Sequence, residues 1–378
     1  MAGLHFFAGM ETGGLEEWTA INGSPSVDTS VVRTGNYALK ISVTGDYVEY
    51  DDSNILDDQV YGFGFYTEDA TPAADRIIFQ AYNPSDNLQY EIVLLSSGKL
   101  RIRRYVLGVP YNHDGTTILN DKQWYWIELY WYPNYNGEFQ LNLDSFSEIT
   151  ASNIDTLEGS AMTAYVRLHG AAEVFYYDDY YQYESCASVE DFLGPRTEVL
   201  GPFQNTAEDA TDQGTTLDQG TWADTGDTPG NDEATPAGYT GDAESGYTIC
   251  DEGNRDGPAA LITGTAKGAK WIHRLSRGNG SGTTHSKVYG KNTSTTSETE
   301  ELSSSWENFF TVSEDTTYMP NSNTDKFTQG FAKSAGGRDI YCAEMWAFLL
   351  HVAPDPSTLD LSDMDFPDQN YYLGPFST

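Results

Sequence analysis

Residues 123–144 read Gln123-Trp-Tyr-Trp-Ile-Glu-Leu-Tyr-Trp-Tyr132, then Pro-Asn-Tyr-Asn-Gly137, then Glu138-Phe-Gln-Leu-Asn-Leu-Asp144. This pattern predicts a β-hairpin. Side chains alternate between the two faces of a strand, and here both faces of the first strand carry large side chains. One face has Tyr125, Ile127, Leu129 and Trp131, and the other has Trp124, Trp126, Glu128 and Tyr130. Such a strand needs cover on both sides, so it belongs inside a sandwich of sheets rather than at a solvated edge.

Strand-like runs continue on both sides of this hairpin. They occupy residues 37–43, 61–66, 76–82, 89–95, 100–106, 164–168 and 174–183, with turn residues between them. Eight or more strands at short spacing are typical of a jelly-roll sandwich. We therefore predict an all-β fold.

The composition and the strand-like pattern of the chain change near residue 195. The tripeptide Leu-Gly-Pro occurs at 193–195, 200–202 and 373–375. We interpret it as a turn that ends a strand, although chance recurrence of common turn residues remains an alternative. Residues 205–246 are rich in Thr, Asp and Gly, which predicts long loops around short strands.

Strand-like runs return at 259–263, 269–275, 286–290, 306–312 and 341–352. The last run has the composition of a helix, but its place in a strand-rich region favours a central strand. We predict two tandem antiparallel β-sandwich (jelly-roll) domains, residues 1–194 and 195–378.

The chain of 378 residues is strongly acidic. It has 57 Asp and Glu against 20 Lys and Arg, a net charge of −37 and a pI near 4.1. A phosphate backbone would be repelled over most of such a surface, which argues against nucleic-acid binding. The charge suits solubility or cation binding, in an ordinary or a halophilic host.

The three cysteines, Cys186, Cys250 and Cys342, are far apart and form no Cys-x-x-Cys pair. This spacing favours free thiols in a reducing compartment over a disulfide framework or a zinc site. The first ten residues lack the basic and apolar regions of a signal peptide, and no stretch is long and apolar enough to span a membrane. We expect synthesis and assembly in the cytoplasm, without membrane insertion.

No catalytic motif is present. A retaining glycosidase on a jelly roll needs two nearby carboxylates, but Glu128 has no acidic partner two or three residues away. The sequence Gly278-Asn-Gly-Ser-Gly282 has the residue types of a nucleophile elbow in the wrong order, and the six histidines show no metal-ligand spacing. We predict no catalytic residues and no enzymatic activity.

A structural calcium ion is the metal that the residues favour. Glu11 follows the first predicted strand, and Asp178 and Asp179 lie in the last strand of the same half. First and last strands of a jelly roll commonly meet, which would bring hard oxygen ligands together. The alternative is that these acids are solvated strand ends.

Four tyrosines suit a glycan-binding role. Tyr132, Tyr135, Tyr180 and Tyr181 could each stack on a sugar ring if their side chains are exposed. Aromatic residues at strand spacing are more often part of a core or an interface. Both interpretations stay open at this point.

Several motifs of the first half resemble one family. They are Phe7-Ala-Gly-Met-Glu-Thr-Gly13, Arg33-Thr-Gly-Asn-Tyr-Ala-Leu-Lys-Ile41, Trp124-Tyr-Trp-Ile-Glu-Leu129 and Val174-Phe-Tyr-Tyr-Asp-Asp179. Together they resemble the concanavalin-like (laminin-G-like) jelly rolls of tailed-virus structural proteins. They are also similar to carbohydrate-binding jelly rolls in which the early Glu and the late Asp hold a structural calcium. The second half is similar in layout to the second sandwich of such virion proteins.

The resemblance implies a non-enzymatic structural protein on a virion surface, either a capsid decoration (turret) or a tail-fibre or tail-tip component. Its expected partners are other virion proteins, further copies of itself and host-surface glycans. The alternative is a glycan-binding module of a cell-surface or secreted protein, and a polysaccharide hydrolase or lyase comes third.

Overall fold

The computed structural model describes residues 3–56, 58–159, 163–184 and 192–203, and beyond these the strands between residues 210 and 353 that are named below. All strand pairs in this part are antiparallel, and it contains no helix. Accordingly, no described helix is long and apolar enough to cross a membrane. The prediction of an all-β sandwich is confirmed.

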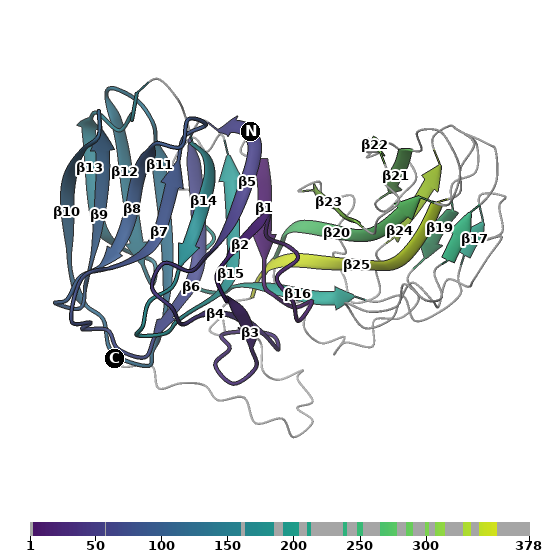
Figure 1. Cartoon of the computed structure of the whole chain (residues 1–378), viewed down its shortest axis with the longest axis horizontal. Coiled ribbons are helices and arrows are strands. Elements are labelled where there is room, and N and C mark those ends of the chain that lie inside the picture. The colour runs from purple at the N-terminus through teal and green to yellow at the C-terminus, as the bar shows by residue number, and fades with distance from the viewer. Residues whose placement is uncertain are drawn as a thin grey trace, which may run out of the picture.

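Two facing sheets form the first half of the chain (Figure 1). Sheet A has the order β13 (Phe146–Ile154), β12 (Gly137–Leu143), β11 (Trp124–Tyr132), β6 (Gln59–Thr67), β15 (Phe175–Glu184), β4 (Ala38–Ile41) and β3 (Ser26–Asp28), and β1 (Gly3–Ala8) also pairs with β15. Sheet B has the order β10 (Val109–Ile118), β9 (Lys99–Val106), β8 (Leu88–Leu94), β7 (Arg76–Tyr82), β14 (Thr163–His169), β5 (Tyr47–Leu56) and β2 (Ala20–Asn22).

Aromatic side chains fill the core between these sheets. Trp131 of β11 stacks on Tyr90 of β8 with ring centroids 3.8 Å apart, and Phe63 of β6 stacks on Phe79 of β7 at 6.0 Å. All four rings are buried. Burying rings of this size is the main stabilising contribution of such a core.

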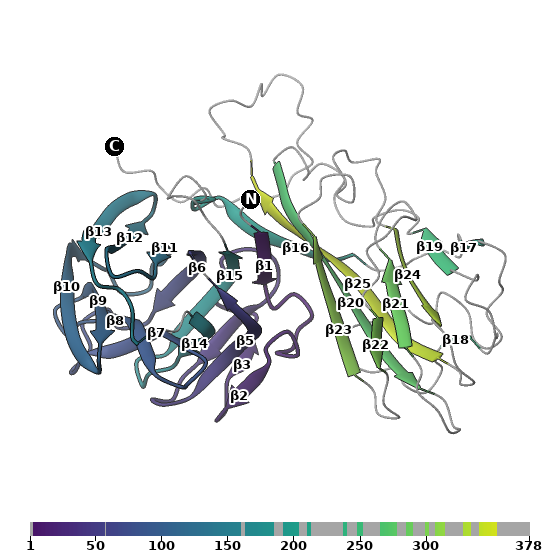
Figure 2. The same cartoon turned by 90° about the horizontal axis from the view of Figure 1, so that it is seen from above.

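Two further sheets form the second half (Figure 2). Sheet C has the order β16 (Thr197–Phe203), β25 (Ile340–Val352), β20 (Thr265–Arg277) and β23 (Glu307–Ser313), and β18 (Ala237–Tyr239) also pairs with β25. Sheet D has the order β17 (Ala210–Asp212), β19 (Thr248–Asp251), β24 (Thr328–Lys333), β21 (His285–Tyr289) and β22 (Thr299–Glu301). The predicted central strand at 341–352 is confirmed as β25. The predicted strand at 259–263 lies outside the described residues.

Strand β11 is covered on both faces, as its sequence requires. Ile127 and Leu129 point into the core between sheets A and B. Trp126 and Tyr130 point the other way, where they cluster with Ile272, Phe348 and Leu350 of sheet C. The second cover therefore comes from the second half of the chain.

The Leu-Gly-Pro tripeptides have two different structures. At 193–195 the chain turns, and the Thr197 amide donates to the Gly194 carbonyl at 3.1 Å. At 200–202 the prediction of a turn is wrong, because this tripeptide lies inside β16, where pairing with β25 is irregular between Leu200 and Phe203. Gly201 has a φ of 139°, which suits a bulge, and Pro202 is tolerated because β16 is an edge strand. The third copy lies outside the described residues.

A buried lysine connects sheet C to the first sandwich. The Lys270 ammonium of β20 donates to the Phe7 carbonyl and to the Glu17 carboxylate. It also lies 4.8 Å from the centroid of the Phe7 ring and 5.3 Å from that of Phe348. Burial lowers the pKa of Lys270, whereas the nearby Glu17 charge raises it. The ammonium therefore depends on Glu17 to remain charged in this site.

We predict that Lys270→Met destabilises the protein by about 3–5 kcal/mol, because it leaves a buried carboxylate without its partner. The double variant Lys270→Met/Glu17→Gln should recover part of this loss, since no uncompensated charge remains. Urea unfolding of the single and double variants measures both values. Equal stability of Lys270→Met and the wild type would contradict the prediction.

Candidate functional site

The outer face of sheet B carries polar and aromatic side chains at every second residue. Their strand neighbours, such as Val48, Ala81 and Val166, point into the core. We define the tyrosine–arginine face by Tyr47, Gln80, Tyr82, Glu91, Tyr165 and Arg167. These residues come from four strands that are adjacent in the sheet, β5, β14, β7 and β8.

Arg167 lies at the centre of a group of three tyrosine rings. Its guanidinium carbon is 4.3 Å from the centroid of Tyr47, 4.6 Å from Tyr82 and 5.1 Å from Tyr165. Tyr82 and Tyr165 are direct cross-strand partners, and their rings stack at 4.8 Å with an interplanar angle of 12°. Cation–π contacts and cross-strand stacking both hold these rings in place.

A chain of hydrogen bonds continues across the next strands. The Tyr82 hydroxyl donates to Gln80 Oε1 at 2.7 Å, and Gln80 Nε2 donates to Glu91 Oε2 at 2.8 Å. Glu91 Oε1 also accepts from the Arg103 guanidinium at 2.5 Å and from the Tyr105 hydroxyl at 3.1 Å. Because each polar group has a partner, the side chains are held in one arrangement before any ligand arrives.

Solvent reaches this face. The side chains of Arg167 and Arg103 are 22% and 25% exposed, and the three tyrosines around Arg167 are half-buried. Partial burial raises the pKa of Tyr82 and Tyr165 above the ordinary tyrosine value, so both phenols stay neutral. Flat neutral rings beside fixed hydrogen-bonding groups can bind a ligand rich in hydroxyl groups.

This face is not among the sites predicted from the sequence. The signal was present in the alternation Gln80-x-Tyr82, Arg101-x-Arg103-x-Tyr105 and Tyr165-x-Arg167. These residues mark the outward positions of neighbouring strands, because strand side chains have a two-residue repeat. Strand order, which the sequence does not reveal, brings the three segments together.

The predicted glycan-binding tyrosines lie elsewhere. Tyr180 is fully buried between the sheets against Trp18, and Tyr181 is fully buried and donates to Glu128 at 2.6 Å. Neither ring can reach a sugar, because β15 is a central strand of sheet A with cover on both faces. For these two residues the condition of an exposed ring is not met, and the alternative of a core position is confirmed.

Tyr132 is half-buried at the end of β11, and Tyr135 is 68% exposed in the following turn. An open hollow of about 520 Å³ lies nearby on the outer face of sheet A. Its lining includes Tyr130, Glu138 and Gln140. Glycan binding at Tyr132 and Tyr135 stays a prediction.

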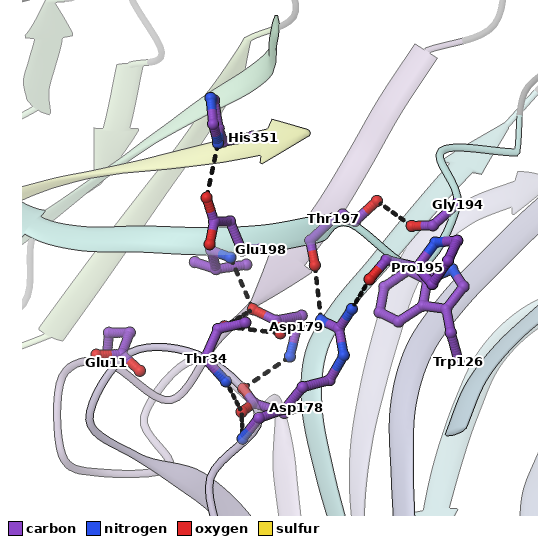
Figure 3. A network of polar contacts seen from close by, with 12 residues as sticks. Glu11, Thr34, Trp126, Asp178, Asp179, Gly194, Pro195, Thr197, Glu198 and His351 are labelled. Atoms are coloured by element: carbon purple, nitrogen blue, oxygen red, sulfur yellow. Dashed lines mark hydrogen bonds and ion pairs between the residues drawn. The ribbon is translucent and has the colours of Figure 1, made fainter. Parts of the chain in front are cut away.

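The predicted calcium ligands lie within β15 and just after β1, the strand that pairs with it. Asp178 and Asp179 are fully buried and Glu11 nearly so, which rules out the alternative of solvated strand ends. Asp178 Oδ2 accepts from the backbone amides of Arg33 and Thr34 at 2.9 and 3.2 Å. Figure 3 shows Asp178, Asp179 and Thr34 in this network, with Glu11 beside it.

Arg33 brings a positive charge to these acids. Its guanidinium donates to Asp179 Oδ2 at 2.5 Å, to the Thr197 carbonyl at 2.6 Å and to the Pro195 carbonyl, and it lies 4.4 Å from the Trp126 ring centroid. The Val199 amide donates to Asp179 Oδ1 at 2.7 Å. The acids therefore hold the segment that leads into sheet C.

Calcium has only partial support from this geometry. Carboxylates are the oxygen ligands that calcium prefers. The single positive charge of Arg33 would offset only part of the negative charge of three ionised carboxylates, and a calcium ion would offset the rest. Glu11, however, accepts from the Asn36 amide at 3.0 Å and the Tyr37 amide at 3.3 Å. Among the residues that the structure describes, no three His, Cys, Asp or Glu side chains converge closely enough to hold a metal ion. As arranged here the carboxylates do not form a calcium site, and calcium stays a prediction.

Burial raises the pKa of Glu11 to about 8 from 4.5, and the Asp179 charge adds to the rise, while the amides of Asn36 and Tyr37 oppose it. Burial also raises the pKa of Asp178 well above its ordinary value, with a further contribution from Asp179. The folded protein thus binds a proton at Glu11 that the unfolded chain has already released. The contribution of Glu11 to stability is present below pH 4.5 and is lost as the pH rises to 8.

We predict that Glu11→Gln is more stable than the wild type at pH 8.5 and about equal at pH 5, when a chelator is present. The difference in the free energy of unfolding at pH 8.5 should reach a few kcal/mol, because a change of one unit in pKa corresponds to about 1.4 kcal/mol. Urea unfolding at the two pH values measures it. The same pH dependence in both proteins would show that Glu11 does not titrate in this range.

The calcium prediction is checked by thermal melting of the same two proteins. Calcium ions should raise the melting temperature of the wild type relative to chelator, because a ligand that binds only the folded state stabilises it. Glu11→Gln should show a smaller rise. An unchanged wild-type midpoint would refute calcium binding.

No family model matches this sequence, and no curated protein matches it. The resemblance to tailed-virus structural proteins therefore has no support from a family model or a curated relative.

Solved structures share only a distant likeness with the chain. An endo-β-1,4-glucuronan lyase from the fungus Trichoderma reesei is 18% identical, with a TM-score of 0.41 over 49% of this chain and 98% of that one. Domain 4 of an extracellular arabinanase from Geobacillus stearothermophilus, in complex with arabinotriose, is 14% identical, with a TM-score of 0.36 over 48% and 93%. A carbohydrate esterase from a Shiga toxin-encoding bacteriophage is 15% identical, with a TM-score of 0.34 over 45% and 90%. These likenesses are too weak to assign a function.

Proposed function

We propose that this protein is a non-catalytic glycan-binding protein and that the glycan binds to the tyrosine–arginine face. The observation that supports this most directly is the stacked pair of Tyr82 and Tyr165 beside Arg167. The pair offers an apolar surface, and the partly exposed Arg167 and Glu49 place hydrogen-bonding groups next to it. The buried Gln80 and Glu91 hold Tyr82 in place. A sugar ring has the matching chemistry, with an apolar face of C–H groups and hydroxyls at its edge.

The rigidity of the face favours binding. Tyr82 and Tyr165 are fixed by stacking, and Gln80 is fixed by hydrogen bonds on both of its side-chain polar atoms. Ordering free side chains costs about 0.5–1.5 kcal/mol for each one immobilised on binding. A face that is already ordered avoids most of that cost.

The acids of the face are arranged for binding rather than for hydrolysis. Glycoside hydrolysis needs one carboxyl group to give up a proton and a second to attack or to activate water. Glu91 accepts hydrogen bonds from Arg103, Gln80 and Tyr105, and Glu49 is paired with Arg167 at 2.7 Å. Carboxylates held in this way by several partners lack the freedom that hydrolysis requires.

We predict that Tyr165→Ala weakens binding to a glycan ligand about tenfold, because truncation of a central aromatic contact typically costs more than 1 kcal/mol. Affinity electrophoresis in gels that contain soluble polysaccharides measures the effect. Tyr135→Ala is the matched control, since Tyr135 is an exposed tyrosine of the turn between β11 and β12. If binding is lost in Tyr135→Ala or Tyr132→Ala but retained in Tyr165→Ala, the glycan site lies on sheet A instead.

The location of the protein on a virion surface remains a prediction from the sequence. A glycan-binding module on a capsid decoration or a tail fibre would serve attachment to a host surface. Immunogold electron microscopy of particles from the source culture tests this location, and an absence of gold on all particles would refute it.

A further inference from the structure

We infer that the ligand of the tyrosine–arginine face is an extended stretch of an uncharged polysaccharide, and not one that carries uronate or sulfate groups. The inference rests on the proposed glycan-binding function and adds the charge class and the shape of the ligand. It follows from how the arginines of sheet B are paired.

Three guanidinium groups on the outer face of sheet B each have a carboxylate partner. Arg167 Nε lies 2.7 Å from Glu49 Oε2, and Arg103 Nη1 lies 2.5 Å from Glu91 Oε1. Arg101 binds Asp114 through two hydrogen bonds, at 2.5 and 2.9 Å. An anionic sugar is normally held by an unpaired guanidinium, often in a bidentate contact. Here it would first have to displace a carboxylate of the protein.

The charge of the whole chain acts in the same direction. A net charge of −37 repels a polyanion as it approaches, over a distance of about 10 Å at 0.1 M salt. Local pairing and long-range repulsion therefore both disfavour an acidic polysaccharide. A neutral chain experiences neither effect, and its hydroxyls can bind the exposed parts of Arg167 and Glu49 without breaking the ion pair between them.

The arrangement of the face indicates an extended ligand. The three ion pairs and the tyrosines lie across six adjacent strands, in the order β5, β14, β7, β8, β9 and β10. With strands about 4.8 Å apart, this surface is roughly 24 Å wide. A surface of that width matches several consecutive sugar units better than one terminal sugar.

The test compares neutral with anionic polysaccharides at low ionic strength, where charge effects are strongest. Mixed-linkage β-glucan, galactomannan, xylan and arabinan form the neutral set, and β-1,4-glucuronan, polygalacturonate and alginate form the anionic set. We expect the full chain to bind at least one neutral polysaccharide, and to lose that binding about tenfold in Tyr165→Ala. Binding of the wild type to the anionic set should be absent.

Two variants test the role of the ion pairs. Glu49→Gln releases Arg167. The change Asp114→Asn combined with Asp75→Asn releases Arg101, because Asp75 lies 3.8 Å from the same guanidinium. Each variant should therefore gain affinity for the anionic set by about tenfold or more. Melting curves verify that both variants are folded. Because the two variants alter different ion pairs, failure of one to fold leaves the other as the test.

The outcomes separate the inference from the function on which it rests. Binding of the wild type to anionic polysaccharides alone, with loss in Tyr165→Ala, would overturn the inference and retain the glycan-binding function. Folded charge variants that gain no anionic binding would also overturn it. If the wild type binds no member of either set, both the function and the inference fail.

Discussion

The central strands of sheet A, β11, β6 and β15, are buried on both faces, and the rest of the structure depends on this burial. One face packs on sheet B through Phe63, Leu129 and their neighbours, and the other packs on sheet C through Trp126 and Tyr130. Because apolar surface on both sides is removed from water, the two halves of the chain share a continuous set of contacts. The outer face of sheet B is the large sheet face of the first sandwich that stays open, and it is where the polar and aromatic residues gather.

Buried charges make the contact between the halves specific. Apolar packing alone tolerates small shifts in position, whereas an ion pair in a dry site tolerates few. Lys270 reaches from sheet C to Glu17, and Arg33 reaches from the first sandwich to the carbonyls of Pro195 and Thr197. Figure 3 shows that Glu198, next to Thr197, pairs in turn with His351 of β25. Each half of the chain therefore supplies a buried cation that binds groups of the other half.

The sequence predicts the strands well and their environments less well. The hairpin of β11 and β12 and the long strand β25 follow from periodicity, because alternation and length are local properties. The burial of Tyr180 and Tyr181 does not. Pairing of β15 with β6 is irregular between Asp178 and Tyr181, and Asp179 has a φ of 52°. This bulge turns Tyr180 toward sheet B and Tyr181 toward sheet C, and both are buried because β15 is covered on both faces. The tyrosine–arginine face likewise depends on strand order, which is a long-range property.

The outer face of sheet A is covered by residues that are synthesised late, so this face is bare while the chain is being made. Residues 3–184 complete sheets A and B, but their partners Ile272, Phe348 and Leu350 emerge from the ribosome much later. During that interval the side chains of Trp126, Tyr130 and Tyr181 lack these packing partners. The nascent first sandwich therefore exposes an aromatic surface that is prone to aggregation. Early stop codons would leave this surface exposed permanently, and aggregation rather than loss of binding would be their first effect.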